Sequence, residues 1–397
     1  MNFWNDPLKV AADWLEGIFT GWGMDAVFAH VLVAFLGVML LIVLLMVVDI
    51  FLVWVERKVV ARFQDRLGPN RLGPFGLIQP FADIIKLIIK EDTTPGSADK
   101  VVYNLAPILS MMSVLILWAV VPLAPVMLGT DLNVGVLFII AAGAIGTLSI
   151  IMAGWSSDNK FALIGGFRQV AVMVSFEIPM LAMLMIPVIF AGSMNMNAII
   201  NSQDVWYFWI SPLGALIFLI AAIAELGRAP FDLAEGESEL VSGYNIEYSG
   251  MKFGMFYAGE LLHAFTFGGF WAILFFGGYR FFGLEQVSPF LAILILIIKA
   301  MIGYWLIMWV RYTVMRTRID QMLAFNWKFL TPLAFALVLV TALMNALLAG
   351  APTWLYILGM FLANVVTGWV ALEIARSVTR KEREQVEGPA KTAEASH

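Results

Sequence analysis

Long apolar runs separated by short polar connections extend along almost the whole chain. Each run reaches or approaches the ~20 residues that a helix needs to cross the hydrocarbon core of a bilayer. The runs lie near residues 28–55, 103–128, 134–153, 169–191, 211–224, 253–278, 290–310, 329–348 and 354–375, and the fifth is the shortest. The pattern predicts an all-α fold, a polytopic membrane helix bundle with about nine transmembrane helices.

Two further segments have helical periodicity but are too short or too polar to cross a bilayer. Near the N-terminus, apolar residues from Trp4 to Trp22 recur at helical spacing, which predicts a surface helix with one side against lipid. After Pro80, the charged residues between Asp83 and Lys90 fall on one side of a short helix whose other side is apolar. This second interfacial helix either rests on lipid headgroups or walls an opening for an amphipathic ligand, and both interpretations fit its spacing.

The distribution of Lys and Arg orients the bundle, because these residues are enriched in cytoplasmic loops. With a periplasmic N-terminus, the periplasmic segments hold only Lys9 and Arg280, and the other loop cations are cytoplasmic. We therefore predict a periplasmic surface segment (residues 1–27), a membrane domain (28–376) and a cytoplasmic tail (377–397). The membrane domain comprises an eight-helix core to about residue 348 and an extra helix at 354–375. The tail is expected to be solvated, with a disordered end.

Composition agrees with this assignment and excludes several kinds of site. Hydrophobic residues make up 61% of the chain and charged residues 13%, far from the usage of soluble proteins. The chain has no cysteine, so it cannot ligate an iron–sulfur cluster through thiolates, hold a thiolate zinc site or form a disulfide. Any redox centre that serves it must therefore belong to another chain.

The segment 224–260, which begins and ends in predicted spans, is rich in carboxylates. Its only local cations are Arg228 and Lys252. The acidic residues are Glu225, Asp232, Glu235, Glu237, Glu239, Glu247 and Glu260. Burial of this loop would raise the pKa of several carboxyls through desolvation and mutual repulsion. An acidic pocket at the end of a membrane bundle predicts proton handling.

Isolated ionisable residues inside the apolar runs are a second sign of function, because charge is costly in the membrane interior. They are Asp49, Glu177, Glu260 and Lys299. Asp49 lies two helical turns before Glu56 on the same face of one helix. His263 lies one turn after Glu260 and could pair with it. For Lys299 a structural role is the simpler interpretation.

Four strings of the sequence resemble the signature regions of one membrane protein family. The strings are ERKVVARFQDRLGPNRLGPFGLIQPFADIIKLIIKE (56–91), FALIGGFRQVAVMVSFEIP (161–179), AELGRAPFDLAEGESELVSGYNIEYSGMKFG (224–254) and IDQMLAFNWKFLTP (319–332). They resemble, in order, subunit 1 of respiratory complex I, which in bacteria is the H subunit of NADH:quinone oxidoreductase. The resemblance runs through roughly residues 28–348. The extra helix at 354–375 goes beyond the eight-helix core of that family.

The resemblance implies a function at the junction between the membrane arm and the peripheral arm of a respiratory enzyme. Such a subunit forms most of the quinone access tunnel and couples quinone reduction to proton translocation across the cell inner membrane. Its partners would be the peripheral-arm subunits that form the quinone site and carry the terminal iron–sulfur cluster, adjacent small membrane subunits, quinone and lipids. Quinone would be a substrate, and FMN and iron–sulfur clusters would belong to partner subunits. No cofactor, metal or nucleic acid is expected on this chain.

The resemblance also assigns roles to residues, although it implies no catalytic redox group in this chain. The residues implied for quinone binding or the tunnel are Glu56, Arg57, Gln64, Phe231 and Asp232. The residues implied for proton coupling are Glu177, Glu225, Arg228, Glu235, Glu237, Glu247 and Glu260. Arg168 and Asp49 are further candidates. The alternative for Arg57 is an ordinary interfacial ion pair with Glu56.

Two other functions stay open on the sequence. One is the equivalent subunit of a membrane-bound hydrogenase or related complex, because the electron donor is determined by other chains. The second is a secondary transporter whose carboxylates carry H⁺ or Na⁺ without redox partners. Inverted repeats would favour the transporter and none is detected, whereas the Gly-Pro and acidic strings favour the redox complex.

Overall fold

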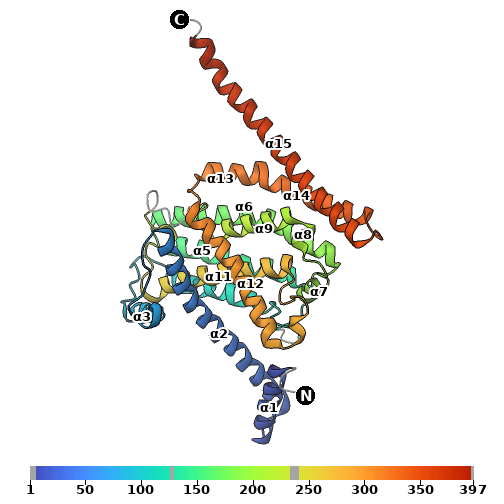
Figure 1. Cartoon of the computed structure of the whole chain (residues 1–397). Helices are drawn as coiled ribbons and strands as arrows, with labels where there is room; N and C mark the ends of the chain where they lie inside the picture. Colours follow the sequence, from blue (N-terminus) through green and yellow to red (C-terminus); the bar gives the residue numbers. More distant parts are fainter. Residues whose placement is uncertain (1–5, 126–128, 233–240, 395–397) are drawn as a thin grey trace.

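The computed structural model describes residues 6–125, 129–232 and 241–394, and the regular elements in these ranges are helical (Figure 1). Among the described residues, eight helices are long and apolar enough to cross a membrane. A further helix, α9 (Pro212–Glu225), is apolar but shorter. Each apolar run noted in the sequence lies largely within a helix. The prediction of an all-α, polytopic membrane bundle is therefore confirmed.

The long helices often extend past the predicted runs, because the flanking polar residues are also good helix formers. Seven of them are single helices: α2 (Ala26–Phe63), α4 (Lys100–Leu117), α5 (Gly135–Ser156), α6 (Lys160–Ala191), α11 (Gly250–Phe276), α12 (Pro289–Thr313) and α15 (Thr353–Glu394). The eighth is a continuous rod made of α13 (Ile319–Phe325), the π-helical η4 (Asn326–Leu330) and α14 (Thr331–Leu347). In α2 the helix continues through the charged residues after Val55, and a Gly-Pro pair follows only at Gly68.

Shorter helices lie at the two ends of the bundle. They are α1 (Pro7–Gly21), η1 (Pro74–Gly76), α3 (Gln79–Ile89), α7 (Met196–Asn201), α8 (Tyr207–Ile210), η2 (Gly243–Asn245) and η3 (Leu284–Gln286). The two predicted amphipathic helices are present as α1 and α3, each with a proline in its first turn. Figure 1 shows α1 and α3 near opposite ends of α2, with α7 and α8 at the end of the bundle away from α3.

The central helix of the bundle is α11, which contacts α4, α9 and α12 as well as α2 and α3. Most of its side chains are buried, whereas α2 and α15 lie at the periphery and expose much of their apolar surface. Apolar side chains on the outside of a membrane bundle face lipid or other subunits. Glu260, near the middle of α11, is therefore held inside the protein.

The last helix, α15, extends beyond the bundle, as Figure 1 shows. It continues to Glu394, so the disorder predicted for the end of the tail is wrong up to that residue. The physical reason is that the sequence RKEREQ at residues 380–385 consists of residues with high helix propensity. A polar sequence therefore continues the helix that begins in the last apolar run.

A close crossing of α11 and α12 fixes the relative position of the two helices. A Cβ atom on Gly303 would lie 2.8 Å from the Cα of Gly268, and one on Gly268 would lie 2.6 Å from the carbonyl oxygen of Ala300. Small residues allow membrane helices to approach in this way. The crossing thereby sets the spacing between Glu260 on α11 and Arg311 on α12.

We expect Gly303→Ala to destabilise the protein by about 1–3 kcal/mol, the usual cost of overpacking a close contact. The added methyl group would overlap α11 and push the two helices apart. The measurement is the thermal unfolding midpoint of the purified protein in detergent. Gly37→Ala is the matched control, since a Cβ on Gly37 of α2 would have nothing within 4 Å. Equal midpoints for the two variants would contradict the close crossing.

Candidate functional site

A buried carboxylate, Glu56, lies near the end of α2 and is bound by side chains from α12. Its Oε1 accepts hydrogen bonds from Arg311 Nη1 at 2.6 Å and from the hydroxyl of Tyr312 at 2.8 Å. Its Oε2 accepts a longer bond of 3.4 Å from the hydroxyl of Tyr304. Glu56 is only 4% exposed, so this set of partners replaces water around the carboxylate.

Arg228 connects this carboxylate to a second one on α11. Its Nε donates to Glu260 Oε1 at 2.8 Å, and its Nη1 lies 3.8 Å from Glu56 Oε1. The residue is 1% exposed. Burial opposes the charge of the guanidinium, but Glu260 and Glu56 together raise the pKa of Arg228 above its ordinary value, so it is always a cation. The network therefore joins α2, α11, α12 and the segment after α9.

A sharp turn after α9 brings Arg228 into the bundle. The helix ends at Glu225, and Gly227 adopts a left-handed conformation with φ of 63°. A Cβ at this position would collide with the side-chain amide of Gln169 on α6. Only glycine combines this backbone conformation with so close an approach. The short sequence Glu225–Arg228 thus directs both a carboxyl group and a guanidinium cation into the bundle.

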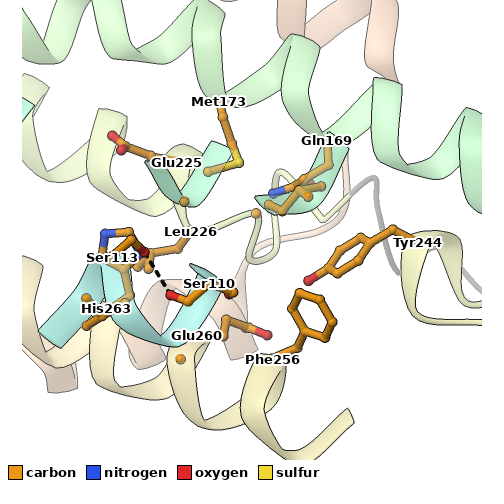
Figure 2. Close-up of a pocket in the computed structure, with 15 residues that line it drawn as sticks. Ser110, Ser113, Gln169, Met173, Glu225, Leu226, Tyr244, Phe256, Glu260 and His263 are labelled. Atoms are coloured by element: carbon orange, nitrogen blue, oxygen red, sulfur yellow. Dashed lines mark hydrogen bonds between the residues drawn. The ribbon is translucent and has the colours of Figure 1, made fainter. Parts of the chain in front are cut away.

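A cavity of about 60 Å³ lies beside the network, between α4, α5, α6, α9 and α11. Its polar lining groups are Ser110, Ser113, Gln169, Glu225, Tyr244, Glu260 and His263. In the view of Figure 2, Glu260 lies between Tyr244 and Phe256 on one side and Glu225 and His263 on the other. The acid that ends α9 and an acid of α11 therefore line the same cavity.

Several polar atoms in this region lack a hydrogen-bond partner among the described residues. They include Gln169 Oε1, Glu225 Oε2 and His263 Nε2 at the cavity, and Asp49 Oδ1 and Arg228 Nη2 nearby. The pairing of His263 with Glu260 expected from the sequence is not formed at Nε2, and the imidazole instead stacks on Phe267 with ring centroids 4.6 Å apart. Buried polar groups without partners are rare in folded proteins and indicate bound water or a functional role.

Two further acids act on this cluster from within the bundle. Glu177 of α6 is half-buried and close enough for its charge to act on Glu225. Asp49 of α2 is 6% exposed, and the charges of Glu56 and Arg228 act on it. The predicted placement of Asp49 on the same buried side as Glu56 agrees with the structure. Asp49 is thus linked electrostatically to the network of Glu56 and Arg228, and Glu177 is linked to Glu225.

Arg57 and Gln64 lie near the surface of the protein, whereas Glu56 is buried. Arg57 Nη1 lies 2.5 Å from Asp83 Oδ2 and so connects α2 to α3. The alternative that Arg57 pairs with Glu56 is wrong, because successive residues of a helix point in different directions. Gln64 is exposed at the end of α2, where it accepts a hydrogen bond from Arg66 Nε at 2.6 Å.

The acidic loop after Arg228 is described only in part. Phe231 is buried with its ring centroid 5.2 Å from that of Phe176 on α6, and Asp232 follows it in a partly exposed position. Arg168 is also partly exposed, one residue before the cavity-lining Gln169. Glu235 and Glu237 lie outside the described residues.

Glu247, at the far end of the loop, lies in a different environment from Glu225. Its Oε1 accepts a hydrogen bond from Asn159 Nδ2 at 2.7 Å, and its backbone carbonyl accepts one from the hydroxyl of Tyr103 at 2.7 Å. Next to it, burial raises the pKa of Tyr248 to about 12. Glu247 does not line the cavity, so the two described ends of the loop contribute acids to separate polar clusters.

Sequence reasoning missed Arg311, Tyr304 and Tyr312 as members of the site. Arg311 counted only as a loop cation, and the signal that could have found it is its place directly after an apolar run, beside Tyr312. By contrast, the structural role predicted for Lys299 is confirmed. Its Nζ donates to the backbone carbonyls of Phe276, Gly278 and Arg280 at 2.7, 2.8 and 2.7 Å.

Comparison with known proteins places the chain in a family. The sequence model described as NADH dehydrogenase matches residues 36–342. A protein of Dehalococcoides mccartyi (strain CBDB1), named as the H subunit of NADH-quinone oxidoreductase, is 45% identical over 290 residues, which cover 73% of this chain and 80% of the relative. The chain belongs to the H-subunit family of NADH-quinone oxidoreductases.

Further members of the H-subunit family match to a similar extent. The protein of that name from Brevibacillus brevis is 43% identical over 297 residues, covering 74% of this chain and 87% of the relative. The one from Bacillus thuringiensis is 41% identical over 297 residues, covering 74% and 88%. The family match contains Glu56, Arg228, Glu260 and Arg311, whereas α1 and α15 lie outside it. In the described part of the chain, no three or more His, Asp or Glu residues cluster in a way that could hold a metal ion.

We expect Glu56→Gln to destabilise this H-subunit family member by about 3–5 kcal/mol, because it removes one partner of a buried ion-pair network. The neutral amide would leave Arg311 and Arg228 poorly compensated. The unfolding midpoint in detergent is the measurement. Asp83→Asn is the control, since it breaks the more exposed ion pair with Arg57, which is worth only about 0–1 kcal/mol. The assignment of Glu56 as a structural anchor fails if both variants unfold at the same temperature.

Proposed function

We propose that this chain is the membrane subunit of a proton-translocating NADH:quinone oxidoreductase that forms the quinone access tunnel and couples quinone reduction to proton translocation. The observation that carries the proposal is the buried network of Glu56, Arg228, Glu260 and Arg311 beside a polar cavity with unpartnered carboxylate oxygens. Membership in the H-subunit family supports the redox part of the proposal.

The tunnel is proposed to start at the junction of α2 and α3. This junction combines the Arg57–Asp83 ion pair with an apolar side of α3 that exposes Phe81, Ile85 and Ile88. A quinone has a polar headgroup and an apolar tail, and an entrance at the membrane interface suits both parts. The proposed path then leads inwards along Glu56 and Phe231, with Gln64 and Asp232 near its opening.

The proton-coupling part is proposed to begin at the Arg228 network and continue through Glu225 to Glu177. Charge that develops on the quinone during reduction would act on the nearby carboxylates. Because acids that interact strongly titrate as a set, a change at one of them alters the protonation of the others. Glu235, Glu237 and Glu247 are proposed to extend the acidic surface of the loop, and Arg168 and Asp49 to adjust the charge balance.

The proposed assembly supplies the chemistry that this chain lacks. Peripheral-arm subunits with FMN and iron–sulfur clusters would deliver electrons to the quinone, and they would dock on the predicted cytoplasmic end of the bundle near α3. Adjacent small membrane subunits and lipids would cover the exposed apolar surfaces of α2 and α15. The cell inner membrane is the proposed location. Family membership favours this assembly over a secondary cation transporter, and a hydrogenase-type donor would be recognised from the partner subunits.

If the buried acids couple reduction to pumping, Glu225→Gln should lower quinone reduction and proton translocation together, by on the order of 10²-fold. The amide is isosteric but cannot release a proton, so assembly should survive. Both rates are measured on the purified complex in proteoliposomes. Glu285→Gln is the matched control, because Glu285 is also partly buried but lies near α12 at the end of the bundle away from α3. Normal turnover of an assembled Glu225→Gln complex would remove Glu225 from the coupling set.

Arg57→Ala tests the proposed tunnel entrance. Loss of the guanidinium should raise the KM for a short-chain quinone and change inhibitor sensitivity, with a smaller effect on kcat, since the residue guides binding rather than reduction. Arg376→Ala is the control, because Arg376 forms a comparable exposed ion pair with Glu373 on α15. The proposed entrance is wrong if Arg57→Ala leaves both quinone kinetics and inhibition unchanged.

A further inference from the structure

His263 is a largely buried titratable group that the proposed tunnel and acid series do not use. It lies on α11, one turn after Glu260, and lines the cavity. Its Nε2 is buried without a hydrogen-bond partner among the described residues, while the ring stacks on Phe267. A purely structural histidine normally has its ring nitrogens satisfied. The stacking contact thus holds the imidazole in a fixed orientation and leaves Nε2 without a hydrogen-bond partner among the described residues.

The cavity is the right size and polarity for water. Its volume of about 60 Å³ exceeds the roughly 10–15 Å³ that one water needs by the same kind of measure. Water also needs several polar partners, and Gln169 Oε1, Glu225 Oε2 and His263 Nε2 are all unpaired here among the described residues. Ser110 and Ser113 add oxygen atoms from α4.

Among the described residues, the ionisable groups around His263 come from identifiable elements. Glu260 is on its own helix, Glu225 comes from α9, and Tyr244 lies in η2. The lining residues of α4, α5 and α6 are not titratable. Beyond the lining, Glu177 acts on Glu225, and Arg228 is bound to Glu260. The imidazole thus faces two carboxyl groups that belong to different helices.

We propose that His263 and ordered water in this cavity relay protons between Glu260 and Glu225. This inference rests on the proposed coupling function and adds to it the group that connects Glu260 with Glu225. In one passage, the Glu260 carboxyl releases a proton to water, and water passes a proton to His263 Nε2 to form the imidazolium. The imidazolium then returns the proton through water to the Glu225 carboxylate. One proton moves, and only O–H and N–H bonds break and form.

Imidazole suits this position better than the groups around it. An imidazole nitrogen can accept a proton and release it again, which is why histidine serves as a proton shuttle in proteins. The stacking contact with Phe267 keeps the ring in place without using a nitrogen atom. The hydroxyls of Ser110 and Ser113 can orient water but do not exchange charge at neutral pH. His263 is therefore a positioning and proton-transfer residue within the coupling path.

The experiment compares His263→Asn, His263→Phe and the control His30→Asn in the whole purified complex, reconstituted in proteoliposomes. Asn keeps a polar side chain that can bind water, and Phe keeps a ring that can stack on Phe267, but neither can carry a proton. His30 is exposed at the start of α2, bound to Glu16 at 2.7 Å. Quinone reduction and proton translocation are measured from about pH 5 to 8, the range in which imidazole charge commonly changes.

Both His263 variants should lower coupled turnover by on the order of 10²-fold and change the shape of its pH profile, whereas His30→Asn should not. Wild-type rate and pH profile in His263→Asn would overturn the relay. If Glu225→Gln is impaired while His263→Asn is normal, only the relay is wrong; if Glu225→Gln is also normal, the proposed coupling function is wrong. A high-resolution density map provides a check that does not depend on activity, because a dry cavity around Nε2 would also overturn the relay.

Discussion

One buried cation, Arg228, constrains the arrangement of the whole site. A guanidinium removed from water is costly unless carboxylates compensate it, and the two that do so come from α2 and α11. Glu56 is in turn held by α12 through Arg311. Elements that are far apart in the sequence must therefore assemble together before the charge of Arg228 is neutralised. The turn at Gly227 is what brings the guanidinium to this position.

The acids around Arg228 divide into two kinds by their partners. Arginines hold the carboxyl groups of Glu56 and Glu260 in a fixed geometry. Glu225 and Asp49 are buried, and each has an oxygen without a hydrogen-bond donor among the described residues. A carboxyl without a compensating cation is the kind that can exchange protons when a neighbouring charge changes. The charges of Glu56 and Arg228 act on the unpaired Asp49, and the charge of Glu177 acts on the unpaired Glu225.

The sequence predicts the helices far better than it predicts the contacts among them. Run length alone finds the spans, and periodicity finds α1 and α3, because both depend on local patterns. Glu225 and Arg228 are recognisable in an acidic segment, but the bond between Glu56 and Arg311 joins positions 255 residues apart. No local pattern encodes such a contact. For the same reason the sequence does not predict the ion pair between Arg57 and Asp83. It also does not predict that Glu247 accepts a hydrogen bond from Asn159 in a cluster separate from that of Glu225.

At one end of the bundle a buried charged group has all its hydrogen-bond partners, whereas at the other end buried ionisable groups lack some of theirs. This contrast argues for function at the second end. Lys299 donates to three carbonyl oxygens at and beyond the end of α11, which gives every proton of the ammonium an acceptor. Around the cavity, Glu225 and His263 keep buried atoms that no described residue pairs. A fold selected only for stability would satisfy such groups or replace them with apolar ones. Their position beside Arg228 fits the proposed gain and loss of protons at this end of the bundle.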